Sequence, residues 1–366
     1  MPVTHQLHRA KESDLPLLDD LWRKVYGGDG SFSENPYGEN REIFFGTVDG
    51  EVAFATIVHD LPLVIRGVTV RCAGIGAVAT LPEYRTKKVG THFLGELLKV
   101  AAGDGFAISS LYGFRETFYR RLGFESCGYR WQLRVEEHRL PNLESDLAVR
   151  RVALEEVSDL NDCFERFIAG FSGGCLRSEA RWRRRLGKVP PSVFALGDPV
   201  EAYLWCDPSG FFDDLEIGEF AWSSRRGYLS GLALMRSLAI NKRAVIWNEP
   251  PDSPYLAQFA DEGVAAKRHR PSMFRILNAD QILQSLEVTA DVRIRLEDDL
   301  LQENGSLIKL GHGGEIAMSP ATLTQAILGE PSVAALIKHG LIPDTPAARA
   351  LAGALPPVSV CHTEFY

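Results

Sequence analysis

A series of short strands that ends at an amphipathic helix restricts the fold of this chain more than any other feature. Apolar runs and alternations predict strands at 43–48, 52–58, 62–72 and 74–80. Pro82 stops the series, and the i, i+4 spacing of Phe93, Leu97 and Ala101 predicts a helix behind it. A further apolar strand is expected at 106–111. Hairpin strands, a helix and a returning strand together predict a mixed α/β domain.

This order of elements partly repeats after the polar stretch 141–144, which is a candidate linker. The second series is predicted to contain strands at 147–152, 193–197, 201–206, 216–222, 243–247 and 272–277 and helices at 155–169 and 227–240. The last residues change character: 290–296 alternates as a half-buried strand, and Ser319-Pro320 predicts a helix start. We therefore predict an α/β fold class with mixed α+β sheets and three domains, at 1–140, 146–280 and 281–366.

The composition is that of a globular protein. Hydrophobic residues make up 45% and charged residues 24% of the 366 residues, which excludes a disordered or collagen-like chain. The formal net charge of −8 argues against a general nucleic-acid binder. No run of 18 apolar residues predicts a membrane span, and the polar N-terminus lacks the apolar core of a signal peptide. We predict a cytoplasmic protein without nucleic-acid or membrane partners.

The six cysteines show no metal-binding pattern. They form no CxxC pair and no His-x₃₋₅-His partner accompanies them, so no metal site is predicted. Sparse cysteines without a pattern suit a reducing compartment, which supports the cytoplasmic prediction.

The segment from Gly76 to Gly90 carries the strongest indication of a binding site. A strand ends there, a short loop with Arg85, Lys87 and Lys88 follows, and the amphipathic helix begins at Gly90. The first-turn amides of a helix lack internal partners and carry the positive end of its dipole, so they bind phosphate groups. A solvated basic turn that only starts the helix explains the same residues about equally well.

A glycine motif lies just upstream of this loop. Residues 74–79 spell GxGxxA, an abbreviated form of the dinucleotide-binding fingerprint. That fingerprint has to open a helix, but here it leads into Thr80-Leu81-Pro82. We interpret the match as chance.

The basic loop resembles the pyrophosphate loop of the GNAT acetyltransferases, [Gln/Arg]-x-x-Gly-x-[Gly/Ala]. Arg85-Thr86-Lys87-Lys88-Val89-Gly90 fits at both ends and has Lys88 where the family usually has its first glycine. A lysine can crowd the backbone or refuse the dihedral angles that glycine allows, or its charge can help to hold phosphates. The resemblance implies acetyl-CoA as co-substrate, with its pyrophosphate on residues 86–91.

A second segment, Phe118-Tyr119-Arg120-Arg121-Leu122-Gly123-Phe124, resembles the Phe-Tyr-x-x-x-Gly-Phe sequence that closes a GNAT core. By position, Tyr119 is the residue that protonates the departing thiolate in that family. A phenol with a pKa of about 10 can protonate a strongly basic thiolate as it forms. Spacing alone favours a packing role for Tyr119, and the upstream loop shifts the interpretation to a general acid.

Over its whole length the chain resembles the Eis-like (enhanced intracellular survival) acetyltransferases. The order of two α/β units and a small α+β domain matches, as do Arg177-Ser178-Glu179-x-x-Trp182, the segment 273–278 and the aromatic-ending tail. The resemblance implies tandem GNAT folds, a sterol-carrier-like third domain and a possible homo-oligomer.

The same resemblance implies a role for the end of the chain. In that family the terminal carboxylate, here that of Tyr366, enters the active site of the first domain. An ionised carboxylate can deprotonate an ammonium group. The family tail commonly ends in phenylalanine, and the alternative is a tail that packs for stability only.

The resemblance also assigns two groups of binding residues. By position, the residues expected at acetyl-CoA are Val78, Ala79, Thr80, Arg85, Thr86, Lys87, Lys88, Val89, Gly90, Thr91, Phe114 and Arg115. The residues expected to line the acceptor cleft are Trp22, Tyr26, Asp29, Phe32, Glu34 and Tyr37. Aromatic rings and carboxylates suit a cationic acceptor, although a solvated loop with incidental charges explains them nearly as well.

We therefore predict an acetyl-CoA-dependent N-acetyltransferase. It would move the acetyl group directly to a primary amine of a small cationic acceptor of an aminoglycoside-like or polyamine-like kind. The alternative is a non-catalytic ligand- or lipid-binding protein with a degenerate GNAT fold. Lys88 favours the alternative, whereas Arg85, Gly90, Tyr119 and the terminal carboxylate oppose it.

Overall fold

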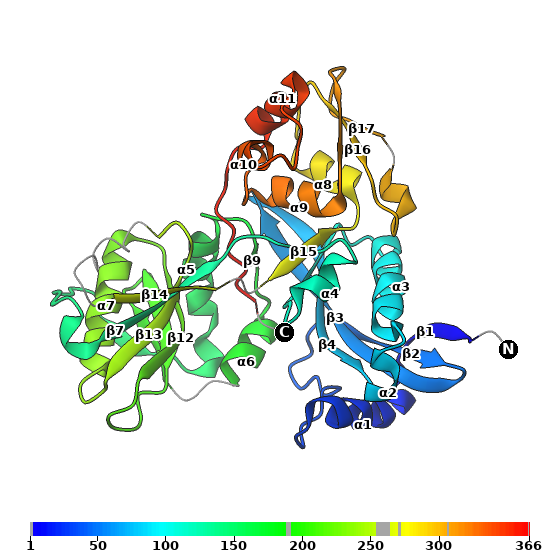
Figure 1. Cartoon of the computed structure of the whole chain (residues 1–366). Coiled ribbons are helices and arrows are strands. Elements are labelled where there is room, and N and C mark those ends of the chain that lie inside the picture. Colours follow the sequence, from blue (N-terminus) through cyan, green and yellow to red (C-terminus); the bar gives the residue numbers. More distant parts are fainter. Residues whose placement is uncertain (1–2, 188–191, 254–263, 270–271, 306, 365) are drawn as a thin grey trace. The chain divides into compact units, whose positions relative to one another are not determined.

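The computed structural model describes residues 3–187, 192–253, 264–269, 272–305, 307–364 and 366. They form two compact units, each built from segments that are distant in the sequence (Figure 1). Unit 1 comprises Met1–Cys127, Pro271–Val358 and Thr363–Tyr366, and unit 2 comprises Gly128–Arg270 and Ser359–His362. None of the helices in these described ranges is long and apolar enough to cross a membrane.

The N-terminal part of unit 1 is a mixed sheet with helices on both faces. Its strands run in the order β1-β2-β3-β4-β5-β15-β6, and β4 and β5 are the parallel pair among antiparallel neighbours. The elements are β1 (His5–Arg9), η1 (Glu12–Asp14), α1 (Leu15–Tyr26), β2 (Arg41–Val48), β3 (Glu51–Ile65), β4 (Val68–Thr80), α2 (Pro82–Arg85), α3 (Val89–Gly103), β5 (Ile108–Leu111), α4 (Glu116–Arg120), β6 (Glu125–Ser126) and β15 (Met273–Ile276).

Alternation along β3 separates two cores in this sheet. Successive side chains of a strand point to opposite faces. Phe54 of β3 shares a core with Phe93 of α3, whereas Ala55 shares a core with Trp22 of α1. The two helices, drawn in cyan and blue in Figure 1, therefore cover opposite faces of the sheet.

β3 and β4 form one long hairpin, so the predicted division into strands at 62–72 and 74–80 is wrong. β3 continues to Ile65, and β4 begins at Val68. The turn lies at Arg66-Gly67, where both residues have positive φ, 51° and 81°. A two-residue turn of this kind matches the twist of its strands. It lies inside an apolar run, and for that reason the hydrophobic pattern did not reveal it.

The strand predicted at 272–277 exists, but it joins the sheet of unit 1 and not that of unit 2. β15 inserts between β5 and β6 of unit 1. Conversely, β7 (Arg130–Glu136), which precedes the expected linker, pairs with β13 and β14 of unit 2. An apolar pattern specifies that a strand is buried and not which sheet it joins. The domain limits given above remain a prediction.

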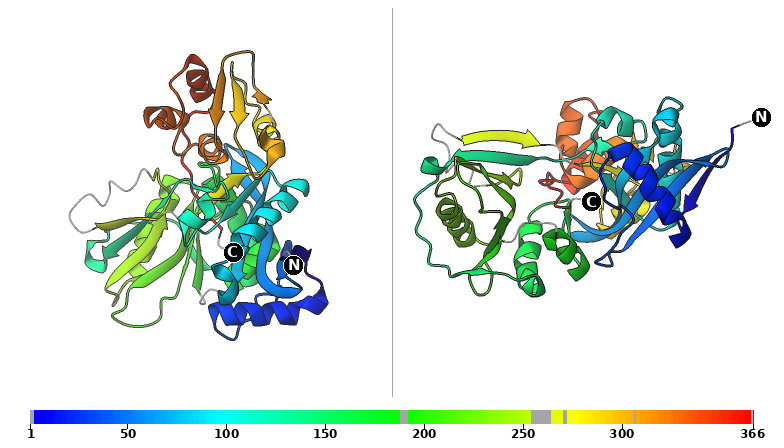
Figure 2. Two further views of the ribbon diagram at one scale, coloured as in Figure 1. Left: turned by 45° about the vertical axis from the view of Figure 1, so that its right-hand side comes forward. Right: turned by 90° about the horizontal axis from the view of Figure 1, so that it is seen from below.

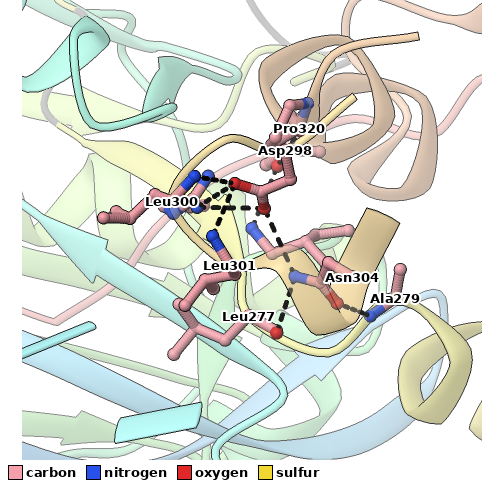
Figure 3. Close-up of polar contacts among 10 residues, drawn as sticks. Leu277, Ala279, Asp298, Leu300, Leu301, Asn304 and Pro320 are labelled. Atoms are coloured by element: carbon pink, nitrogen blue, oxygen red, sulfur yellow. Dashed lines mark hydrogen bonds and ion pairs between the residues drawn. The ribbon is translucent and has the colours of Figure 1, made fainter. Parts of the chain in front are cut away.

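A buried ion pair joins the C-terminal part of unit 1 to this sheet. Nη2 of Arg275, on β15, lies 2.9 Å from Oδ1 of Asp298, and both side chains are almost fully buried. Asp298 and Asn304 also bind backbone groups of Leu277, Ala279, Leu300 and Leu301 (Figure 3). Buried charges with this many partners fix the packing of the elements that carry them.

The C-terminal part of unit 1 contains a small sheet of order β17-β16-β18. β16 pairs antiparallel with β17 and parallel with β18, and α11 contacts β18. The orange and red-brown ribbons at the top of the left view in Figure 2 belong to this part of the chain. Ser319 caps α9 by accepting a hydrogen bond from the amide of Thr322, which confirms the predicted helix start. The elements are α8 (Ala279–Ser285), β16 (Arg293–Leu296), η5 (Gln302–Gly305), β17 (Leu307–Lys309), β18 (Glu315–Met318), α9 (Pro320–Leu328), α10 (Val333–Lys338) and α11 (Pro346–Ala354).

Unit 2 is a second mixed sheet, with the strand order β14-β7-β13-β12-β11-β10-β8. It also contains one parallel pair, β12 and β13, joined by the helix α7. Its elements are β7, η2 (Glu137–Arg139), β8 (Val149–Arg151), η3 (Leu154–Glu156), α5 (Ser158–Ile168), β9 (Gly174–Cys175), α6 (Glu179–Gly187), β10 (Ser192–Leu196), β11 (Ala202–Cys206), β12 (Leu215–Trp222), α7 (Arg225–Leu238), β13 (Ala244–Glu249) and β14 (Val264–His269).

A buried carboxylate organises the core of unit 2. Glu219 of β12 accepts hydrogen bonds from Arg177 at 2.7 Å, Arg185 at 2.6 Å and Tyr203 at 2.7 Å. Burial alone raises the pKa of Glu219, but the two guanidinium groups outweigh it and lower this pKa from 4.5 to about 2. The carboxylate is therefore ionised at neutral pH.

We expect Glu219→Gln to destabilise unit 2 by about 3–5 kcal/mol at pH 7, because it removes the negative charge that pairs with the buried Arg177 and the partly buried Arg185. A carboxylate whose folded pKa is depressed stabilises the fold above its unfolded pKa and loses that contribution as pH falls through the folded value. The difference between variant and wild type should therefore shrink as pH falls from 4.5 towards 2. Denaturant unfolding at pH 7 and pH 3.5 measures both effects, and equal free energies of unfolding at pH 7 would contradict the expectation.

Candidate active site

β4 is bent near its carboxyl end by a β-bulge. Its register against β3 shifts between the pairs Ala55–Ala79 and Ile57–Gly76. Ala77, within the bulge, has a φ of 50°, a left-handed conformation that costs a residue with a side chain about 1–2 kcal/mol. Bulges re-aim the groups of a strand and recur beside binding sites.

Side chains from neighbouring elements hold the bulge through its carbonyl groups. The hydroxyl of Thr56, the indole of Trp22 and the hydroxyl of Tyr26 donate to the carbonyls of Gly76, Ala77 and Val78, at 2.9, 2.7 and 2.5 Å. Trp22 is fully buried. Two residues expected at the acceptor, Trp22 and Tyr26, therefore shape β4 directly, and Thr56 is a site-forming residue that sequence reasoning missed.

One side of β4 is open beyond the bulge. β4 pairs with β5 only from Cys72 to Ile75, and in the described part of the chain no strand pairs with that side of residues 76–80. The amide of Leu81 donates to Ala53 of β3. Because amides alternate in direction along a strand, the amide of Thr80 points away from β3. An extended molecule with carbonyl groups can bind such an edge as an added strand would.

The basic loop leads into α3 through a left-handed residue. Lys88 is the N-cap of α3, with φ 60° and ψ 15°. This is the conformation that glycine adopts most readily, so Lys88 keeps the glycine-like backbone of the loop it resembles. The first-turn amides of α3 follow directly, and Nε of Arg85 donates to the carbonyl of Thr80 at 3.0 Å. The loop is thereby fastened to the end of β4.

Gly90 lets the start of α3 approach β4 closely. A β-carbon at this position would lie 2.9 Å from Oγ1 of Thr80. The absence of a side chain therefore brings two features to one place: the helix N-terminus, which favours phosphate, and the open edge of β4.

These groups line one pocket of about 310 Å³ in unit 1. The lining residues that the sequence predicts are Tyr26, Val78, Thr80, Arg85, Lys88, Gly90, Thr91, Phe114, Arg115 and Tyr119. Val25 and Phe118 complete the lining and were not predicted. Phe118 belongs to the quoted motif around Tyr119, so the signal for it was present.

Other predicted binding residues lie outside this lining. Ala79 and Val89 are buried in the two cores, and Thr86 and Lys87 are exposed on the loop. Of the acceptor residues on the 28–42 loop, Phe32 packs at 5.6 Å from the ring of Trp22 and 5.4 Å from that of Tyr26. Asp29 and Glu34 are exposed and Tyr37 is half-buried, and none of them reaches the pocket lining.

Tyr119 lines the pocket from α4. The residue is 2% exposed, and its ring makes edge contacts with Phe118 at 5.0 Å and with Phe114 at 6.0 Å. Burial raises the pKa of the Tyr119 phenol well above its ordinary value of 10, and the neighbouring Tyr26 adds to the effect. The phenol therefore keeps its proton at neutral pH and can donate it.

The last residue of the chain lies on β4 beside this site. A β-carbon at Gly76 would be 3.2 Å from the terminal carbonyl carbon of Tyr366, and one at Gly74 would be 3.1 Å from Cζ of its ring. The hydroxyl of Tyr366 lies 2.6 Å from Oγ of Ser110 on β5. The terminal carboxylate is thus held at the bulge, two residues before Val78, where β4 begins to line the pocket. Gly74, Gly76 and Ser110 are contact residues that the sequence did not identify.

In unit 2, the N-terminus of the corresponding helix α7 is capped by side chains of the protein. In unit 1 the parallel strands β4 and β5 are connected through α2 and α3, and in unit 2 the helix α7 connects the parallel strands β12 and β13. Its N-cap Ser224 accepts from the amide of Gly227, and the Ser224 hydroxyl donates to the carboxylate of Glu201 at 2.6 Å. A side-chain cap and a carboxylate at this end disfavour a phosphate. A helix start of this kind without a side-chain cap is that of α3 in unit 1. Nowhere in the described ranges do three or more His, Cys, Asp or Glu side chains gather as metal ligands would.

Comparison with known proteins identifies the class. Residues 6–127 match the family model described as an acetyltransferase (GNAT) domain. This segment contains the β4 bulge, the basic loop, α3 and Tyr119, so the domain that carries the pocket is a GNAT acetyltransferase domain and the protein is an acyltransferase. No curated protein matches the chain in sequence.

Solved structures match the whole chain. One is a protein from Enterococcus faecalis V583 described as a probable N-acyltransferase, with 16% identity, a TM-score of 0.87 and coverage of 98% of this chain and 99% of that one. A GCN5-related N-acetyltransferase from Anabaena variabilis ATCC 29413 has 18% identity, a TM-score of 0.86 and coverage of 98% of each chain. Eis1 from Mycobacterium abscessus has 19% identity, a TM-score of 0.79 and coverage of 98% and 100%. These similarities confirm the fold, with its several mixed sheets, along the entire chain.

Proposed function

We propose that this protein transfers the acetyl group of acetyl-CoA directly to a primary amine of a small cationic acceptor. The observation that carries the proposal is the pocket of unit 1. It combines a helix N-terminus with a basic loop, an open strand edge and a proton-bearing phenol, and the terminal carboxylate lies on the same strand. A binding protein with a degenerate fold has no need for this combination.

The pocket residues fit acetyl-CoA in an order that follows its chemistry. The first-turn amides of α3, with Arg85 and Lys88, would hold the pyrophosphate. The open edge of β4 at residues 78–80 would bind the amide-containing arm, and Phe114, which is 76% exposed at the pocket, would cover it. Acetyl-CoA supplies the reactive thioester. A backbone amide at the bulge polarises the carbonyl group that is attacked.

Two groups of the chain act as general base and general acid in this proposal. The carboxylate of Tyr366 would accept the proton of the incoming ammonium group, which frees the amine lone pair for attack. The phenol of Tyr119 would then protonate the departing sulfur. No covalent intermediate with the protein is needed, since both partners can be held together in one pocket.

The acceptor class rests on the surroundings of α1 and the 28–42 loop. Trp22, Tyr26 and Phe32 form an aromatic cluster beside the bulge. Because Trp22 is fully buried, the aromatic faces that can attract a cation such as an amine of an aminoglycoside or polyamine are those of Tyr26 and Phe32, together with a carboxylate. The structural neighbours do not decide the substrate, so the acceptor has to be found by experiment.

The proposal can be tested with binding first and turnover second. Acetyl-CoA at millimolar concentration should raise the melting temperature by several degrees, because it binds only the folded state. A panel of amines should then be screened for CoA release and for a mass increase of one acetyl group. Absence of any thermal shift would reject the transferase and favour the binding protein.

Lys88 gives a prediction that separates charge from backbone conformation. Lys88→Gly should raise the free energy of unfolding by about 0.5–1 kcal/mol, because it removes a side chain from a left-handed position. The same change should weaken acetyl-CoA binding a few-fold at low salt, since one cation near the phosphates is lost. Calorimetric titration at 50 mM and 500 mM salt, with Lys88→Arg as the charge-retaining control, measures this. Affinity unchanged at low salt would remove Lys88 from the phosphate site.

We further propose that residues 281–366 form a sterol-carrier-like domain, that the protein is cytoplasmic and that it assembles as a homo-oligomer. The support is the resemblance in element order, together with six cysteine side chains that are all buried. Light scattering of the full chain tests the assembly.

A further inference from the structure

The Gly74-Ile75-Gly76 sequence, interpreted above as a chance fingerprint, has a structural use. Residues two apart in a strand face the same side, so both glycines open the same face of β4. A β-carbon at Gly74 would lie 3.1 Å from Cζ of the Tyr366 ring and 2.5 Å from a methyl carbon of Leu61, and one at Gly76 would lie 3.2 Å from the terminal carbonyl carbon of Tyr366, so a side chain at either position would force a neighbour to move. The two glycines therefore form a flat floor on which the last residue lies lengthwise.

The side chains around these two glycines contact the ring and the hydroxyl of Tyr366. Ser110 of β5 is fully buried, and its Oγ lies 2.6 Å from the hydroxyl of Tyr366. The rings of His59 and Tyr112 flank that of Tyr366 at 5.4 and 5.9 Å. We call the surface formed by Gly74, Gly76 and Ser110 the tail socket.

Two further contacts stabilise the arrangement. The hydroxyl of Tyr112 donates to the carbonyl of Glu364, two residues before the end of the chain. On the inner side, Oγ of Ser110 lies 3.3 Å from Sγ of Cys72. Burial raises the pKa of the Cys72 thiol to about 12, so it stays protonated and uncharged beside the serine. Ser110 thus connects the core of the sheet to the end of the chain.

We infer that Ser110 is a positioning residue: by binding the phenol of Tyr366 it fixes the carboxylate of that residue at Gly76, and the tail socket fits tyrosine better than phenylalanine at position 366. A phenylalanine would fill the floor equally well but would leave the buried Ser110 hydroxyl without this partner. The inference rests on the proposed function only for the role of the carboxylate as a base. The binding of the tail stands on the contacts alone.

Anchoring matters because a chain terminus is otherwise mobile. The last residues of a domain fray unless side chains hold them down. A catalytic carboxylate acts only while it is held close to the reacting atom, and misplacement by about 1 Å can cost a factor of 100 in rate. A hydroxyl at the far end of the ring fixes both the position of Tyr366 along β4 and its rotation.

The test measures how fast carboxypeptidase A releases residue 366 from the folded, full-length protein. It compares the wild type with Tyr366→Phe, Ser110→Ala and the double variant. Rates are normalised to free peptides with the same ending. Each single variant should release its last residue about 5-fold faster, the effect expected for loss of one neutral hydrogen bond. The double variant should be no faster than either single one. Ser109→Ala is the matched control, because Ser109 is also buried on β5 but its hydroxyl donates to the carbonyl of Ala73.

Unchanged release in Tyr366→Phe, additive effects in the double variant, or equal acceleration in Ser109→Ala would each overturn the inference. If Ser110→Ala does not fold, Tyr366→Phe alone still decides, because it changes only one hydroxyl at the end of the chain. Once an acceptor is known, Ser110→Ala should lower kcat several-fold and leave the KM for acetyl-CoA unchanged. If the variants release their last residue faster but the wild type transfers no acetyl group to any amine, the tail socket is supported and the proposed function is rejected.

Discussion

Replacing Tyr119 with phenylalanine is expected to lower kcat for acetyl transfer by about 100-fold or more, with little change in the affinity for acetyl-CoA. General acids contribute factors of this size when they protonate a leaving group, and 100-fold corresponds to about 2.7 kcal/mol of transition-state stabilisation. The substitution removes one hydroxyl and keeps the ring, which packs edge-on against Phe118 and Phe114. The loss should therefore be chemical and not structural.

The pH profile adds a second test of the same role. Because burial raises the pKa of Tyr119 above 10, the acid form persists, and kcat of the wild type should not decline through this group up to about pH 9.5. Single-turnover rates with a thermal melt for each variant separate chemistry from folding. Tyr84→Phe is the control: Tyr84 lies on the neighbouring helix α2 and does not line the pocket. A Tyr119→Phe rate within 3-fold of wild type would remove the general acid from the mechanism.

Local sequence was sufficient to predict the part of the pocket lining that the basic loop and the start of α3 supply. Arg85, Lys88, Gly90 and Thr91 lie within seven residues, so one strand–loop–helix connection determines where all of them point. Tyr119 follows from a motif of similar length. Resemblance over such short segments carries over well because their geometry depends on hydrogen bonds between near neighbours.

Features that depend on distant segments could not be read in this way. The role of Gly74 and Gly76 appears only when Tyr366, 290 residues further on, lies on them. The exchange of β7 and β15 between the sheets is equally invisible, since a buried strand has the same pattern in either sheet. Likewise, Lys88 adopts a left-handed backbone although its residue type disfavours it, because the loop is fastened at both ends. The strands and helices of unit 1 could be predicted from the sequence, whereas the contacts between its distant segments could not.

Removal of Tyr366 should have the second large effect, lowering kcat by about 100-fold. The new terminal carboxylate would sit one residue back along the chain, about 3.3–3.8 Å from the position at Gly76. Since positioning errors of about 1 Å already cost this much in rate, a whole residue removes the base from the site. Binding of acetyl-CoA should persist, because the residues that line the pocket do not include the tail.

Two companion variants distinguish the carboxylate from the packing of the tail. Tyr366→Phe keeps the carboxylate and the ring and should retain kcat within about 5–10-fold of wild type, the loss coming from the missing bond to Ser110. Extension of the chain by one glycine keeps Tyr366 but moves the terminal negative charge away from Gly76. This variant should lose as much activity as the variant that lacks Tyr366. Each variant is compared by kcat and KM with one amine acceptor, and by carboxypeptidase sensitivity. A glycine-extended chain that turns over at the wild-type rate would mean that the tail only packs against β4, and the base would have to be another group.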